Sequence, residues 1–223
     1  MLETKKLQKR GIEYLSLDFS NSRYNSVCFD GMPFQEWYDD QCITYRFSWD
    51  FSATITGRDE QDSAVADIGI VCGTWINCCR ELQQEFPFLI FCDIISQELY
   101  DFAEAITDKS GYIRNSVLGV PCKILYLDQL YLEPEYRGLG IGSYVFENFQ
   151  GLFHFAHNFD YDVVCLTPIP QERNEGGVIS KLEAVDYDER RRALVRFYQK
   201  AGARFINGSD FMLKKTTGPR RIV

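Results

Sequence analysis

The chain has 223 residues, of which 45% are hydrophobic and 25% charged, a composition typical of a globular protein with one large domain. Its formal net charge of −8 argues against general nucleic-acid binding, which needs a basic surface. The eight cysteines form no Cys-x-x-Cys pair and there are two histidines, so we expect no metal site.

The N-terminal residues and the cysteines bear on the location of the protein. The first ten residues, MLETKKLQKR, carry charges without an apolar stretch behind them, and no apolar run approaches membrane-spanning length. We therefore expect no secretory signal, no membrane partner and a cytoplasmic location. In that setting, scattered cysteines are expected to be buried, reduced thiols.

The first half of the chain is predicted to be mainly β-structure. Residues 12–19 alternate weakly between apolar and polar types, compatible with a strand, and belong to residues 1–41, which we treat as an N-terminal extension packed on the core. Residues 42–57 and 64–78 are rich in β-branched and aromatic types, and predict two antiparallel strands joined by a polar loop. Residues 93–107 have the apolar spacing of a helix.

The second half alternates between predicted strands and helices. Residues 123–132 are apolar on both faces, as expected of a central strand covered on both sides. Residues 141–157 carry an apolar helical stripe, and residues 162–167 predict a short buried strand that ends before two prolines. Residues 171–186 form a polar insertion.

The C-terminal region is predicted to contain one helix and one hairpin. Asp186 and Glu189 resemble a capping box at the start of a helix over 187–201, which Gly202 ends. A closing hairpin is expected around the Asn-Gly pair at 207–208.

The stretch Leu127–Phe146, LDQLYLEPEYRGLGIGSYVF, is the most informative part of the sequence. An apolar strand is followed by a glycine-rich turn and then by an amphipathic helix. The first N–H groups of a helix lack partners and lie at the positive end of its dipole. Three glycines in five residues let the backbone approach a phosphate, and Arg137 adds a positive charge. The turn therefore predicts a phosphate or pyrophosphate site.

Two known phosphate motifs compete for this turn. A Walker A loop is excluded because no Gly-Lys-Ser/Thr follows. A dinucleotide-binding fingerprint nearly fits, with Gly138, Gly140 and then Ser143 in place of the third glycine, and with Asp160 and Asp162 at a suitable distance downstream. A nucleotide-dependent oxidoreductase is therefore an alternative hypothesis.

The turn also resembles a specific family motif. The sequence LEPEYRGLGIG of residues 132–142 is similar at every position to the acetyl-CoA-binding motif of the GCN5-related N-acetyltransferase (GNAT) superfamily, a strand ending in Val/Leu-x-Pro-x-Tyr followed by Arg/Gln-x-x-Gly-x-Gly/Ala. FYQKAG at 197–202 is similar to the Phe-Tyr-x-Lys-x-Gly of the family's last helix. The resemblance covers residues 120–214.

This resemblance implies an α/β (α+β) fold: a mixed, mostly antiparallel twisted sheet with helices on both faces and a V-shaped splay between the strands at 123–132 and 162–167. It places the domain at residues 42–214, followed by a flexible tail at 215–223. Acetyl-CoA would be the cosubstrate, without a metal. The implied cofactor-binding residues are Leu130, Tyr131 and Leu132 along the pantetheine arm, and Arg137, Gly138, Leu139, Gly140, Ile141, Gly142 and Ser143 around the pyrophosphate.

Two residues are candidates for catalysis. Tyr198, in the FYQKAG segment, resembles the general acid of the family, which protonates the leaving thiolate. Asp128 is a carboxylate within an otherwise apolar strand, and a buried charge usually has a partner or a task. Its role as general base and a purely structural hydrogen bond are both open, and Glu172 is a weaker candidate for the base.

The expected function is the transfer of an acetyl group from acetyl-CoA to a primary amine by direct attack. The acceptor is a small-molecule or peptide amine that the sequence does not identify, and residues 20–41 and 169–186 are expected to shape its pocket. The alternative from another class is a non-catalytic CoA-binding or sensing module, in which Tyr198 and Asp128 are structural. A monomer and a homodimer both fit the sequence.

Overall fold

The structure is a computed structural model that describes residues 2–20, 47–79, 82, 86–119, 122–158, 160–174, 176–182 and 185–216. Its helices are α1 (Thr4–Gln8), α4 (Phe88–Ile95), α5 (Gln97–Ile106), the 3-10 turn η1 (Pro134–Tyr136), α6 (Ile141–His157) and α7 (Tyr187–Lys200). Its strands are β1 (Tyr14–Ser20), β2 (Ser48–Arg58), β3 (Ala64–Cys78), β4 (Cys122–Leu132), β5 (Val163–Leu166), β6 (Gln171–Arg173), β7 (Ile179–Lys181), β8 (Arg204–Phe205) and β9 (Met212–Lys215).

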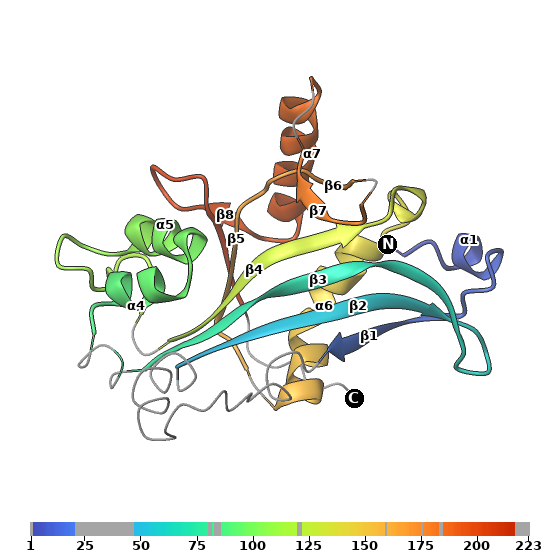
Figure 1. The fold of residues 1–223 in the computed structure, drawn as a ribbon, viewed down its shortest axis with the longest axis horizontal. Helices are drawn as coiled ribbons and strands as arrows, with labels where there is room; N and C mark the ends of the chain where they lie inside the picture. Colours follow the sequence, from blue (N-terminus) through green and yellow to red (C-terminus); the bar gives the residue numbers. More distant parts are fainter. Residues whose placement is uncertain are drawn as a thin grey trace.

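A seven-stranded sheet in the order β1-β2-β3-β4-β5-β9-β8 forms the centre of the fold (Figure 1). Neighbouring strands are antiparallel except β4 and β5, which are parallel. Parallel neighbours need a crossover connection, and α6 supplies it. The prediction of a mixed, mostly antiparallel sheet is confirmed.

Helices cover both faces of this sheet, as predicted. Alternate residues of a strand point to opposite faces, so Leu125 of β4 and Val164 of β5 pack with Phe149 of α6 on one face. Ile124 and Val163 pack on the other face, with residues of α4 and α5. Because β4 is covered on both sides, most of its sequence is apolar without alternation.

The region around residues 93–107 differs from its prediction. Two helices occupy it, because Ser96 adopts extended backbone angles between α4 and α5. The Ser96 hydroxyl accepts a hydrogen bond from Leu99 N and caps α5. The first of the two helices begins at Phe88, five residues earlier than predicted.

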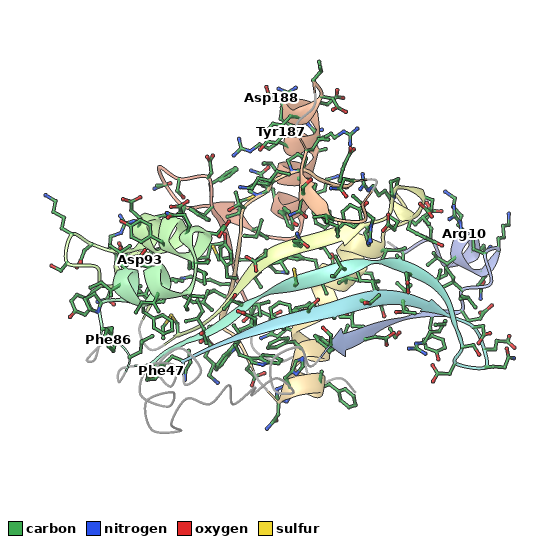
Figure 2. The ribbon with its side chains drawn as sticks, viewed as in Figure 1. Arg10, Phe47, Phe86, Asp93, Tyr187 and Asp188 are labelled. Carbon is green, nitrogen blue, oxygen red and sulfur yellow. The ribbon has the colours of Figure 1, made fainter. Side chains whose placement is uncertain are left out.

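The polar insertion and the start of α7 also differ from expectation. Part of the insertion forms the β6–β7 hairpin, a second, two-stranded sheet. The capping box is not formed, because Asp186 makes no side-chain cap and its carboxylate accepts a hydrogen bond from Arg190 instead. Figure 2 shows Tyr187 and Asp188 at the outer end of α7, which projects away from the sheet.

The two ends of the chain are more integrated than their predictions suggest. Strand β1 is paired with β2 over its whole length, although it lies in the region treated as an extension. At the other end, Lys215 belongs to β9, and the Thr216 hydroxyl donates to the carbonyls of Tyr161 and Asp162, so the predicted tail begins later than residue 215. Residues 21–46 and 217–223 lie outside the described residues.

Two further observations concern the described ranges alone. No helix in them is both long and apolar enough to span a membrane. Of the six cysteines in them, Cys78, Cys92, Cys122 and Cys165 are buried, and all six are free thiols.

Candidate functional site

Strands β4 and β5 separate partway along β4. Their four-residue pairing ends at Leu127 with Leu166, whereas β4 continues to Leu132 beside β3. Residues 128–132 therefore have no described strand neighbour on the β5 side. An extended ligand can hydrogen-bond to such an open strand edge as an additional strand.

A β-bulge lies where the two strands part. Neighbouring residues of β3 pair with Leu127 and Gln129 of β4, so Asp128 is the extra residue. The strands approach closely here because Gly73 of β3 has no Cβ, which would lie 2.0 Å from the carbonyl oxygen of Tyr126. Because of the bulge, the side chains of β4 do not alternate regularly between the two faces of the sheet, and those after Asp128 point to the opposite face from the one a regular strand would give them.

The turn between β4 and α6 has the geometry of an anion site. Gly138 and Gly140 have positive φ angles of 75° and 80°, a region that suits glycine. Gly140 is the N-cap of α6 and provides no side-chain cap. From Gly138 to Ser143, no backbone N–H donates to an acceptor within the described residues. These free amides lie at the positive end of the helix dipole, where an anion is stabilised.

A cleft of about 640 Å³, here called the glycine-loop cleft, is enclosed by this turn, the open part of β4, residues 167–171 and α7. That volume is in the range of small-molecule sites. Nine of the ten residues predicted to bind the cofactor line it: Leu130, Tyr131, Leu132, Arg137, Gly138, Gly140, Ile141, Gly142 and Ser143. Leu139 is the exception, because its side chain is 8% exposed and packs in the core.

Arg137 is held at the end of β4. Its Nε donates to Leu132 O at 2.8 Å, and its guanidinium lies 5.3 Å from the ring centre of Tyr131. These contacts fix the side chain beside the free amides. Its charge therefore adds to the positive potential of the cleft.

Tyr198 of α7 also lines the glycine-loop cleft. Its side chain is 6% exposed, and its ring makes edge contacts with Phe146 and Phe197 at centroid distances of 5.3 and 4.8 Å. Burial raises the pKa of its phenol, so the group is protonated at neutral pH. No hydrogen bond joins its hydroxyl to another described residue, which leaves it available to a ligand.

Asp128 differs from the sequence-based expectation. The bulge directs its side chain into open space, so it is exposed rather than enclosed in the sheet. The surrounding protein still removes part of its hydration, and this burial raises the pKa of its carboxyl to about 7, with smaller contributions from Asp50 and Glu98. Asp128 can therefore exchange a proton near neutral pH.

A second cavity of about 900 Å³, here called the acidic cavity, adjoins the first. It is bounded by β2, β3, β4, the start of α5 and the β6–β7 hairpin. Five residues line both spaces: Leu127, Asp128, Thr167, Ile169 and Gln171. The two spaces therefore meet at Asp128. This residue, the predicted general base, faces both of them.

The β6–β7 hairpin was not predicted, yet it borders both spaces. Arg173 of the hairpin pairs with Glu133 at 2.8 Å, and the Glu133 side chain is 22% exposed. Glu172, the weaker candidate for the base, is engaged in an ion pair with Arg190 of α7. The polar sequence of the insertion offered no alternation from which these strands could be read.

The positions of Asp160 and Asp162 argue against the dinucleotide alternative. In that fold, the ribose-binding carboxylate follows the strand after the glycine turn, at the carboxyl edge of the sheet. Both residues precede β5 and lie at the opposite edge. Asp162 accepts from Lys123 N at 2.8 Å, and Asp160 pairs with His154 at 3.0 Å.

Comparison with known proteins adds no family assignment. No family model and no curated protein matches this chain. Within the described ranges, no group of three or more His, Cys, Asp or Glu side chains is arranged to hold a metal ion.

Proposed function

We propose that the protein is an acyl-CoA-dependent N-acetyltransferase with a GNAT-like fold. The observation that carries the proposal is the run of free amides from Gly138 to Ser143. This run opens into a cleft that also contains the part of β4 beyond Leu127, which has no described strand neighbour on the β5 side. A pyrophosphate fits the amides and an extended pantetheine arm fits the strand edge. The LEPEYRGLGIG motif adds sequence support.

The glycines are consistent with a bound phosphate. Gly138 and Gly140 adopt conformations that present the amides, and Gly142 leaves the floor of the cleft open. A Cβ on Gly142 would lie 3.6 Å from the side chains of Leu132 and Phe197, in space that the ligand would use. Arg137 supplies the compensating positive charge.

The acceptor amine would approach from the acidic cavity, opposite the cofactor. Asp128 takes a proton from the ammonium, and the neutral nitrogen attacks the thioester carbonyl carbon. The C–N bond forms, the C–S bond breaks, and Tyr198 gives its proton to the departing thiolate sulfur. The acylated nitrogen then gives up its second proton to solvent, Tyr198 regains a proton from solvent, and Asp128 releases its proton to solvent. The ammonium and acetyl-CoA therefore yield the acetamide, free CoA and one proton.

A ligand screen tests the cofactor assignment. Acetyl-CoA and CoA are expected to raise the melting temperature, whereas NAD and NADP are not. A ligand at 100 times its Kd stabilises the folded state by about 2.7 kcal/mol. Stabilisation by NAD alone would contradict the proposal and favour the oxidoreductase alternative.

A turnover assay separates an enzyme from a binding module. Free thiol released from acetyl-CoA is measured with a panel of primary amines at pH 8. Tight acetyl-CoA binding with no amine-dependent thiol release above the uncatalysed rate would instead support a CoA-binding or sensing module.

A further inference from the structure

The acidic cavity reaches well beyond the point at which an acceptor nitrogen would react. It shares Asp128 with the glycine-loop cleft. It then extends over β2 and β3 to the start of α5, where Glu98 and Asp101 lie. At about 900 Å³ it can hold an extended small molecule with its reactive end at Asp128.

The charge of the lining is strongly negative. Five carboxylates line the cavity, against one basic residue of the lining, Lys181 on the exposed side of β7. They are Asp50, Glu98, Asp101, Asp128 and Asp210.

These carboxylates are not equally available to a ligand. Asp210 is paired with Arg191 at 2.7 Å. Asp50 accepts a hydrogen bond from Thr74, and Asp101 accepts one from Gln97, both at 2.8 Å. No described cation pairs with Glu98, Asp101 or Asp128, so these three leave an uncompensated negative charge on the β4 and α5 sides of the lining.

Apolar side chains also line the acidic cavity. The ring of Tyr126 lies close enough to both Asp128 and Glu98 that their charges add to the effect of burial in raising the pKa of its phenol. Tyr126 also packs near Phe211, at a centroid distance of 6.5 Å, and both line the cavity beside Ile95. An alkyl chain can pass over this surface and bury its methylene groups.

We propose that the acceptor is a small linear amine with a second protonated nitrogen, a diamine or polyamine. This inference rests on the acetyl transfer proposed above. The reacting nitrogen lies at Asp128, the methylene chain crosses Tyr126 and Phe211, and the second ammonium lies at Glu98 and Asp101. Only the reacting nitrogen gives up protons and forms the amide. The second nitrogen stays charged throughout and anchors the molecule at Glu98 and Asp101.

Matched amines test the anchor. At pH 8, the diamine 1,4-diaminobutane is expected to have a KM at least about 10-fold below that of butylamine, because butylamine lacks the second charge. The ratio of the butylamine KM to the diamine KM is expected to fall as the salt concentration is raised from about 0.05 to about 0.5 M. Equal KM values for the two amines would overturn the inference and leave the acetyl transfer intact.

Variants of Glu98 and Asp101 test whether these residues bind the second ammonium. Glu98→Gln and Asp101→Asn are expected to raise the KM for the diamine about 10-fold and to leave the KM for butylamine unchanged. Asp210→Asn is the matched control, because the Asp210 charge is already neutralised by Arg191, and it is expected to change neither KM by more than about 2-fold. A diamine KM unaffected by the first two variants would overturn the assignment.

A binding measurement distinguishes this inference from the proposed function. Titration of the full chain with 1,4-diaminobutane in a calorimeter is expected to show one site, weakened about 10-fold in Glu98→Gln. If no amine is acetylated but this binding is seen, acetyl transfer fails and the cation site stands. If amines are acetylated but the diamine binds no better than butylamine, or a lysine peptide is the better acceptor, the cation site fails alone.

Discussion

Asp50 on β2 and Asp128 on β4 face the same cavity, although β3 lies between their strands. Burial raises the pKa of Asp128 to about 7, and the negative charge of Asp50 adds to that increase. Two like charges in one partly desolvated space favour protonation of one of them. The pair therefore links the shape of the sheet to proton transfer at the proposed reaction centre.

The first prediction concerns pH. Because Asp128 must be ionised to accept a proton, we expect kcat/KM to fall as the pH drops below about 7. Asp50→Asn removes a like charge and lowers the pKa of Asp128, so the acidic limb of the profile should move to lower pH. Asp210→Asn, which removes a carboxylate already paired with Arg191, should leave the limb in place. If the acidic limb of the pH profile does not move in Asp50→Asn, the charge of Asp50 does not influence the pKa of Asp128.

The second prediction concerns stability. The pKa of Asp128 in the folded state lies above its ordinary value, so the fold binds the proton more tightly than the unfolded chain does. The free energy of unfolding therefore loses a contribution as the pH rises from about 4 through about 7, and this loss levels off once the carboxyl is ionised in both states. Asp128→Asn should melt at or above the wild-type temperature at pH 8, while kcat/KM falls about 100-fold or more. A lower melting temperature with normal turnover would assign Asp128 a structural role.

The third prediction concerns Tyr198. Its hydroxyl makes no hydrogen bond to a described residue, so Tyr198→Phe should preserve both folding and acetyl-CoA affinity. Loss of the proton donor should lower kcat about 100-fold, and less with an acyl donor whose leaving group needs no proton. Tyr161→Phe, at another buried tyrosine outside both spaces, is the control and should keep full activity. Full activity in Tyr198→Phe would make Tyr198 a packing residue.

The fourth prediction concerns the glycine turn. Gly140→Val combines two effects, because Val is strained at a positive φ in addition to any obstruction of the ligand. Gly142→Val separates them, since Gly142 lies in the first turn of α6 without a positive φ. It should weaken acetyl-CoA binding at least about 10-fold by calorimetry while the chain stays folded. Gly119→Val, in open space, is the control; unchanged affinity in Gly142→Val would contradict the pyrophosphate site.

The fifth prediction concerns the approach of β3 to β4. A methyl group on Gly73 would lie 2.0 Å from the Tyr126 carbonyl oxygen, so the strands must separate at the bulge. We expect Gly73→Ala to lower the free energy of unfolding by about 3 kcal/mol or more, measured by urea denaturation. Gly119→Ala should be within about 0.5 kcal/mol of wild type. A wild-type midpoint for Gly73→Ala would mean that the strands lie further apart than described.

The local parts of the site were predictable from sequence. The conformation of the turn at 138–142 depends on glycines that are adjacent in the chain, and α6 follows from a stripe of apolar residues. The break at Ser96 was also within reach, because a serine three residues before Leu99 is a common N-cap.

The non-local parts were not predictable. The exposure of Asp128 follows from a bulge, and a bulge depends on the register between β3 and β4, which no stretch of β4 specifies alone. The acidic cavity gathers carboxylates from β2, β4 and α5, which are far apart in sequence. The hairpin at its edge has a polar sequence that carries no strand periodicity.

The bulge has a consequence for how such a site can arise and be lost. Leu127 and Leu130 both face the core beneath α6, although three positions separate them and a regular strand would require two or four. If Asp128 were deleted, Leu130 and Leu132 would still face the same side of the sheet. Leu127 and Gln129 would become neighbours in the chain, and their adjacent β3 partners would then pair with them in a ladder without a bulge. A single codon thus separates a plain strand from one that carries both a distorted backbone and the proposed proton acceptor, and its loss is expected to abolish the proposed acetyl transfer while sparing the fold.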